Sequence, residues 1–217
     1  MDKLSNQQVL DAGLAEWRKL AQGLHARYAV PDYMAAAAFL GAVAQVADAE
    51  GHHPDVKLTS GAVDVSLATR EDGVWVTQKD IDMARRISEL AGKSGLEPDP
   101  DAVTQLEIAL DTASEEKVGP FWSVLLTGSA DNRIYDSIFD PTGRVPGLWF
   151  QSTEDHDAPR QRWHFDLWLA PEVADQRIAA AVAAGGSVVD ASAAPSFTVL
   201  ADLDGNRVCV CTSLERA

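Results

Sequence analysis

The chain has little positive charge and little histidine. Among its 217 residues, 18 are Lys or Arg, 33 are Asp or Glu and 5 are His, which gives a net charge of −15 with histidine neutral. Because the phosphate backbone of nucleic acids attracts positive charge, this balance argues against a nucleic-acid partner. The hydrophobic content of 46% is ordinary for a globular protein, so each half of the chain can bury a core of its own.

Cysteine and long apolar runs are scarce as well. Cys209 and Cys211 would point to the same face of a strand and are too close in sequence to staple a fold, so we expect reduced thiols. The longest apolar run, YMAAAAFLGAVAQVA, is shorter than a membrane span and ends in acidic residues. The N-terminal MDKLSNQQVL lacks the basic-then-apolar pattern of a signal peptide. The sequence therefore predicts a cytoplasmic protein with no membrane partner.

One stretch separates two periodic segments of the chain. AGKSGLEPDPDA, residues 91–102, combines Gly, Pro and acidic residues in the manner of a linker. We expect a first domain over residues 1–92, a linker over 93–102 and a second domain over 103–217. Each domain then has roughly 90 to 115 residues, which is enough to fold independently.

The first half is predicted to be α+β, with helices on one face of a small antiparallel sheet. Ser5 can cap a helix over residues 5–22, whose apolar side would hold Val9, Leu10, Leu14 and Trp17. The further elements expected are a strand over 23–30, a helix from Pro31 to about Glu50, a strand holding Val63, Val65 and Leu67, and a helix capped by Thr77.

Two of the five histidines, His52 and His53, are adjacent in the turn after the long helix. Histidine has an unperturbed pKa of roughly 6.5, which makes it the natural side chain for moving protons at neutral pH. One histidine can act as the acid while its neighbour positions or stabilises. The alternative is that a His-His-Pro turn merely caps the helix, where imidazolium meets the negative end of the helix dipole. The pattern alone leaves both interpretations open.

The segment ADAEGHHPDV, the alternating strand after it and TREDGVWVTQKDIDMA together resemble the pterin-4a-carbinolamine dehydratase family. Trp17, the strand residues Leu24, Arg27 and Tyr28, and the helix start at Asp32 fit the same pattern, so that the resemblance covers about residues 4–91. Members of this family dehydrate a 4a-hydroxytetrahydropterin to the quinonoid dihydropterin without metal or cofactor. The resemblance implies a hydro-lyase with a pterin substrate and no cofactor.

The resemblance also assigns roles to individual residues. His52 and His53 would supply the acid and the base, while Asp48 matches an acidic position that orients a histidine. Arg70 follows the strand threonine where the family has a third histidine, and arginine cannot shuttle a proton at working pH. Where the family has an aromatic residue, this chain has Ser60. Because of these two departures we expect a weakened enzyme. The candidate site comprises His52, His53, Asp48, Asp80 and Arg70 as catalytic residues and Pro54, Ser60 and Thr69 as substrate-binding residues.

The second half repeats one pattern of elements. Strand, helix and three strands are expected from the segment TQLEIALDT to GLWFQST, and again from QRWHFDLWL to NRVCVCT. A helix over residues 171–184 begins at Pro171 and ends before two glycines. Paired βαβββ units of this kind predict a curled sheet around a central cavity.

The segments FW, RWHFD and LADLDGNRVCVC in this order resemble the glyoxalase-like members of the vicinal oxygen chelate superfamily, over about residues 103–214. Enzymes of that superfamily hold a divalent metal through His, Glu or Gln on four strands. His164, Gln151 and Glu107 lie at or near three of those positions. Arg207, a cation, replaces the usual glutamate on the last strand. We therefore expect no complete metal site, and a metal-free pocket or an interaction domain instead.

Three classes of function follow from these observations. The first is a pterin dehydratase that uses His52 and His53, and we favour it because the His-His-Pro-Asp segment is intact. The second is a metalloenzyme or small-molecule binder that uses the glyoxalase-like cavity. The third is a non-catalytic assembly protein, favoured by Arg70 and Arg207 together. Assembly into a homo-oligomer stays open.

Overall fold

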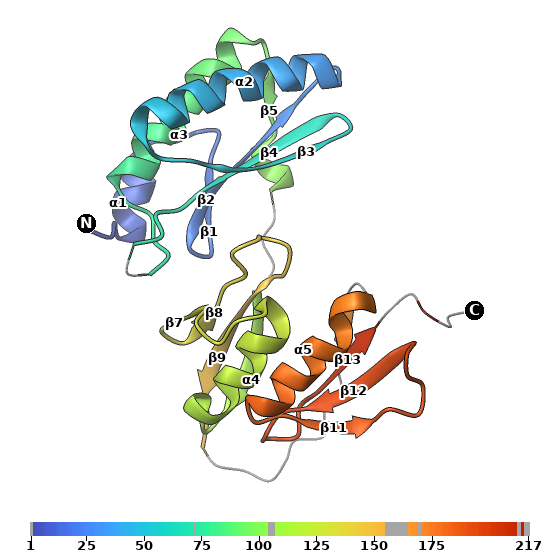
Figure 1. The fold of residues 1–217 in the computed structure, drawn as a ribbon. Coiled ribbons are helices and arrows are strands. Elements are labelled where there is room, and N and C mark those ends of the chain that lie inside the picture. Colours follow the sequence, from blue (N-terminus) through green and yellow to red (C-terminus); the bar gives the residue numbers. More distant parts are fainter. Residues whose placement is uncertain are drawn as a thin grey trace. The chain divides into compact units, whose positions relative to one another are not determined.

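The computed structural model describes residues 2–71, 73–103, 107–154, 165–168, 171–211 and 214. The chain forms two compact units, residues 1–105 and 106–217, each of which is described by itself (Figure 1). Within the described residues, every helix is too short or too polar to cross a lipid bilayer.

The first unit is an antiparallel sheet with helices packed on one face (Figure 1). The strands follow the order β1-β2-β4-β3, and β5 pairs with β2. This arrangement confirms the α+β prediction. In chain order the elements are α1 (Asn6–Asp11), β1 (Arg18–Leu20), β2 (Gly23–Ala29), α2 (Tyr33–Glu50), β3 (Asp55–Thr59), β4 (Ala62–Leu67), α3 (Gln78–Lys93), β5 (Glu97–Pro98) and the 3₁₀ helix η1 (Pro100–Ala102).

The helix predicted over residues 5–22 is wrong beyond its first turns. Ser5 caps α1 as expected, but the helix ends at Asp11 and Gly13 adopts a left-handed φ of 66°. Leu10, predicted on the apolar side, is 69% exposed. Trp17 is buried from a loop position and donates its indole N–H to Ser88 on α3 at 3.0 Å. The apolar spacing of this segment therefore reflects a loop packed on the core, followed by the short strand β1.

Helix α2 carries the chain to the paired histidines. It begins two residues later than predicted, because Asp32 is its N-cap and accepts a hydrogen bond from the backbone N–H of Ala35 at 2.8 Å. Its buried face is Ala36, Phe39, Val43 and Ala47. Gly51 ends the helix in the left-handed region at φ 63°, a conformation that glycine adopts without strain.

Helix α3 begins at the predicted cap. Thr77 and Asp80 form a capping box, and the face below it buries Met83, Ala84 and Ile87 in the core. The stretch 93–102, expected to be a linker, contains the end of α3, then β5 and η1. Pro98 pairs with Tyr28 of β2, and Leu96 is 6% exposed. This stretch is therefore bonded to the first unit.

The second unit confirms the repeated βαβββ pattern. Its sheets have the orders β6-β9-β8-β7 and β10-β13-β12-β11, and in each the first and last strands of the repeat pair in parallel. The described strands form two separate sheets without closing into a barrel. The elements are β6 (Glu107–Thr112), α4 (Glu115–Thr127), β7 (Arg133–Ile134), β8 (Ser137–Ile138), β9 (Gly147–Ser152), β10 (Asp166–Trp168), α5 (Pro171–Ala183), β11 (Ser187–Asp190), β12 (Phe197–Ala201) and β13 (Arg207–Cys211).

One core joins the two repeats of the second unit, with residues from α4, α5 and both sheets. The indole of Trp122 on α4 donates a hydrogen bond to the carboxylate of Asp202, after β12, at 2.8 Å. From α5, the guanidinium of Arg177 donates to the carbonyl of Leu125 near the end of α4 at 2.7 Å. Polar contacts from the second repeat thus hold the helix of the first.

Candidate functional site

The two adjacent histidines are each paired with a carboxylate, in different surroundings. Nε2 of His52 lies 2.8 Å from Oδ1 of Asp80, with the His52 side chain 12% exposed and that of Asp80 fully buried. Nε2 of His53 lies 3.0 Å from Oδ1 of Asp48, and these side chains are 63% and 80% exposed. Gly51, in the left-handed conformation, ends α2, and both histidines follow directly after it. One pair is therefore held in the interior and the other stands in solvent.

Asp80 is held by its place at the start of α3. Its Oδ2 accepts the backbone N–H of Thr77 at 2.8 Å, the hydroxyl of Thr69 at 2.8 Å and the hydroxyl of Thr77 at 3.0 Å. A buried carboxylate is tolerated only where such donors replace water. The positive end of the helix dipole stabilises the same charge. The capping box thus places a fully satisfied carboxylate under His52.

Thr69 and Thr77 are both buried, and their hydroxyl oxygens lie 2.7 Å apart. The sequence predicts Thr69 as a substrate-binding residue, whereas its hydroxyl is directed to Asp80 in the structure. Thr77 was expected only as a helix cap. Its second contact, to the hydroxyl of Thr69, depends on long-range packing that sequence spacing does not reveal.

Arg70 lies at the exposed edge of this cluster. Its Nη2 donates to Oδ2 of Asp55 at 2.5 Å, and the side chains are 58% and 60% exposed. Asp55 begins β3, three residues after His52, and its pairing with Arg70 depends on tertiary packing that sequence spacing does not indicate. The backbone of Thr69 exchanges hydrogen bonds with Trp75 at 2.8 and 3.0 Å, which fixes the loop after Arg70.

The two remaining candidates of the first unit have different positions. Pro54 is half-buried and directly follows His53. Ser60 is exposed in the turn between β3 and β4, at the opposite end of β3 from Asp55. The five residues of β3 separate Pro54 from Ser60, a distance of roughly 20 Å along the extended strand. Hydrogen bonds therefore join His52, Asp80 and Thr69, and His53 and Asp48, whereas Pro54 and Arg70 are only their neighbours along the chain and Ser60 lies away from them.

The two candidate metal ligands of the second unit that the structure describes, Glu107 and Gln151, lie apart. His164 lies outside the described residues. Glu107 pairs with Gly147 and Gln151 pairs with Asp111, so the two candidates are four positions, or roughly 13 Å, apart along β6 and β9. No group of three or more His, Cys, Asp or Glu side chains suited to a metal ion occurs in the part of the chain that the structure describes.

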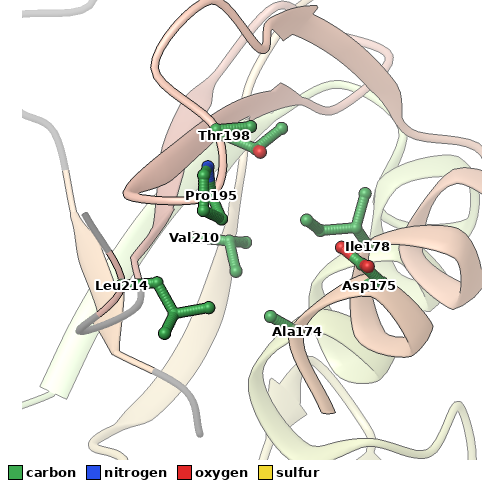
Figure 2. A pocket seen from close by; sticks show the side chains of 8 residues that line it. Ala174, Asp175, Ile178, Pro195, Thr198, Val210 and Leu214 are labelled. Atoms are coloured by element: carbon green, nitrogen blue, oxygen red, sulfur yellow. The ribbon is translucent and has the colours of Figure 1, made fainter. Parts of the chain in front are cut away.

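A hollow of about 360 Å³ lies in the second unit between α5 and the strands β12 and β13 (Figure 2). Most of its lining residues are apolar, but polar atoms make up as much of the lining surface as apolar ones, and Figure 2 shows Asp175 on α5 across from Thr198 on β12. Val210 lines this hollow, so Arg207, at an odd number of residues from it on β13, belongs to the opposite face of the sheet. The residues lining the hollow are Ala174, Asp175, Ile178, Ala194, Pro195, Thr198, Val210 and Leu214.

Comparison with known proteins matches the two units to two families. Residues 2–90 match the model of pterin 4 alpha carbinolamine dehydratase, and residues 107–211 match that of a glyoxalase-like domain. A relative from Thermosynechococcus vestitus is 36% identical over 80 residues, which are 37% of this chain and 83% of the relative. The chain belongs to the pterin-4a-carbinolamine dehydratase family.

Further relatives of the family match the same unit. One from Streptomyces coelicolor is 36% identical over 96 residues, or 43% of this chain and 95% of the relative. Both relatives carry the name "Putative pterin-4-alpha-carbinolamine dehydratase". A crystal structure described as a transcriptional coactivator/pterin dehydratase from Brucella melitensis is 29% identical with a TM-score of 0.40, and the match covers 42% of this chain and 100% of that one. The two family matches and the relatives together describe a family member fused to a glyoxalase-like domain.

Proposed function

We propose that the first unit dehydrates a 4a-hydroxytetrahydropterin to the quinonoid dihydropterin. The observation that carries this proposal is the pair of adjacent histidines, each within 3.0 Å of a carboxylate. The reaction breaks the C4a–OH bond and one ring N–H bond and forms a C=N bond and water. It needs an acid for the departing hydroxyl and a base for the N–H proton, and two oriented imidazoles supply both.

The arrangement at Arg70 explains why this enzyme should be slow. A third histidine would add one more group able to transfer protons, whereas Arg70 stays charged and is bonded to Asp55. Individual acid–base groups contribute typically about 10²–10⁴-fold to the rate. Two histidines without the third leave a weakened catalyst that still exceeds the uncatalysed rate.

Stopped-flow absorbance of the decaying hydroxypterin tests the proposal directly. His53→Ala and His52→Ala should each lower the rate by about 10²-fold or more. Gln45→Ala, an exposed change on α2, is the matched control and should leave it unchanged. A wild-type rate equal to that of the uncatalysed reaction would refute the dehydratase and favour a non-catalytic assembly protein. Circular dichroism of each variant separates lost chemistry from lost folding.

The hollow in the second unit supports a second candidate function, the binding of a small molecule with one polar group and a short apolar body. Thr198 and Asp175 offer one hydroxyl and one carboxylate beside apolar side chains, and the lining surface is polar and apolar in equal parts, so an amine or alcohol with a short apolar body suits it. NMR titration with hexylamine should shift the amide signals of Thr198 and Val210, while Ile178→Trp should abolish those shifts by filling the space. Shifts that persist in Ile178→Trp would place the binding elsewhere.

A further inference from the structure

The hydrogen bonds around Asp80 determine which nitrogen of His52 carries a proton. The backbone N–H of Thr77 and the hydroxyls of Thr69 and Thr77 lie 2.8 to 3.0 Å from Oδ2, and because the two hydroxyls are also 2.7 Å apart, the N–H and at least one hydroxyl donate to Oδ2 at any time. Oδ1 is left for Nε2 of His52, 2.8 Å away, and no other donor bonds to it among the described residues. An ionised carboxylate accepts hydrogen bonds and donates none. The proton between Oδ1 and Nε2 therefore belongs to His52.

We propose that Asp80, with Thr69 and Thr77 as positioning residues, holds neutral His52 as its Nε2–H tautomer, so that Nδ1 is the nitrogen that reacts with the pterin. The inference rests on the proposed dehydratase function and adds the reacting atom to it. Nδ1 accepts the proton of the substrate N–H, and the electron pair of that bond forms C=N as the C4a–O bond breaks. The departing hydroxyl takes a proton from the imidazolium of His53 and leaves as water.

The second histidine lacks this fixed arrangement. The carboxylate of Asp48 is 80% exposed, and His53 is its one hydrogen-bond partner among the described residues. Solvent can therefore compete for both groups, so that His53 can adopt either tautomer and regain a proton from water after each turnover. His53 is the internal comparison for any measurement on His52.

Replacing Asp80 with asparagine should reverse the tautomer of His52. The backbone N–H of Thr77 and the hydroxyl of Thr69 need an acceptor, so the amide oxygen must take the place of Oδ2. The amide nitrogen then stands in place of Oδ1 and donates to Nε2, which requires Nε2 to carry a lone pair. The proton of neutral His52 moves to Nδ1. The cap of α3 survives, because the amide oxygen still accepts the Thr77 N–H.

Long-range ¹H–¹⁵N NMR of the imidazole rings tests the tautomer in the full chain. His52→Gln and His53→Gln assign the signals, and a titration locates the pH range in which His52 is neutral. We expect wild type to show the Nε2–H pattern at His52 and Asp80→Asn to show the Nδ1–H pattern. Thr69→Val removes the hydroxyl that positions Asp80, so it should give a partial mixture of the two tautomers. Thr69→Ser keeps that hydroxyl and should show the Nε2–H tautomer alone. The signals of His53 should stay unchanged throughout.

Kinetics supply the second readout. Asp80→Asn should lower the dehydration rate by about 10²–10⁴-fold, because in serine proteases the same exchange beside a catalytic histidine acts through the wrong tautomer. A reversed tautomer with an unchanged rate would refute Nδ1 as the reacting atom, while the dehydratase would stand.

The NMR outcome does not depend on activity. A wild-type spectrum with Nδ1–H or a mixture at His52, or an Asp80→Asn spectrum identical to wild type, would overturn the inference. If Asp80→Asn does not fold, the wild-type spectrum and the Thr69→Val and Thr69→Ser pair decide the question. A wild type with the expected tautomer and no dehydratase rate would instead refute the proposed function, and with it the role of Nδ1 in the reaction.

Discussion

Arg70 and Asp55 form an ion pair with 2.5 Å between Nη2 and Oδ2, beside the histidine turn. Both side chains are more than half exposed, and exposed pairs contribute about 0–1 kcal/mol to stability. Arg70 can therefore be substituted without loss of the fold.

Arg70→His should raise the dehydration rate by about 10²-fold or more, because it returns a titratable group to the edge of the site. The control is Asp55→Ala, which breaks the same ion pair without adding a histidine and should leave the rate near that of wild type. Stopped-flow absorbance compares both with wild type. Equal rates for Arg70→His and wild type would show that a third proton-transfer group is not what this site lacks.

The bond between Trp122 and Asp202 should contribute measurably to the stability of the second unit. Trp122→Phe leaves the Asp202 carboxylate, which is 5% exposed, with one donor fewer, so we expect a loss of about 1–3 kcal/mol in free energy of unfolding. Urea denaturation measures this loss. A double-mutant cycle with Asp202→Asn isolates the pair, and a coupling energy near zero would contradict the assignment.

The loop after β8 should lose hydrogen-exchange protection in acid. Partial burial raises the pKa of Asp140, but hydrogen bonds from Thr142, Arg144 and Val145 together lower it below its ordinary 3.8. A lowered pKa in the folded state means that the stabilisation is complete above the unfolded pKa and is lost as pH falls through the folded value. The amides of Arg144 and Val145 should lose protection below pH 3.8.

Asp140→Asn is the control for that loop. An amide does not titrate, so the two amides should show the same protection on either side of this range, after correction for the intrinsic exchange rate. If the protection of these amides in wild type were as independent of pH as in Asp140→Asn, the charge of the Asp140 carboxylate would not hold the loop.

Local signals in the sequence predict much of this fold. Thr77 and Asp80 form the capping box that their spacing indicates, and Gly51 ends α2 where glycine is expected. Both features depend on residues within four positions of one another. Short strands carry no such signal: β1 forms because its backbone pairs with β2, although Trp17 beside it continues a helical apolar spacing.

The candidate site divides in the same way. The histidine pair and its acidic neighbours are visible in sequence because adjacency and family spacing mark them. The hydroxyl of Thr69 reaches Asp80 only because β4 ends beside the start of α3, a relationship of tertiary packing. Ser60 matches the family by its distance from His53 along the chain, yet β3 is extended and carries it away from the cluster.

Fragments of the chain should show where the first unit ends. Pro98 pairs with Tyr28, the backbone N–H of Asp99 donates to the carbonyl of Arg27 at 2.8 Å, and Leu96 is 6% exposed. A fragment of residues 1–103 keeps these contacts, whereas a fragment of residues 1–92 loses them. Losing a buried leucine alone costs about 2–5 kcal/mol, a large part of the stability of a domain this small.

We therefore expect the fragment 1–103 to unfold cooperatively in urea and the fragment 1–92 to be less stable by at least about 2 kcal/mol. Leu96→Ala in the longer fragment is the matched control, since it removes the side chain and keeps the pairing of β5. Leu96→Ala should reproduce part of the stability difference between the two fragments, and the remainder should come from the loss of β5. Equal midpoints for the two fragments would show that residues 93–102 act as a linker after all.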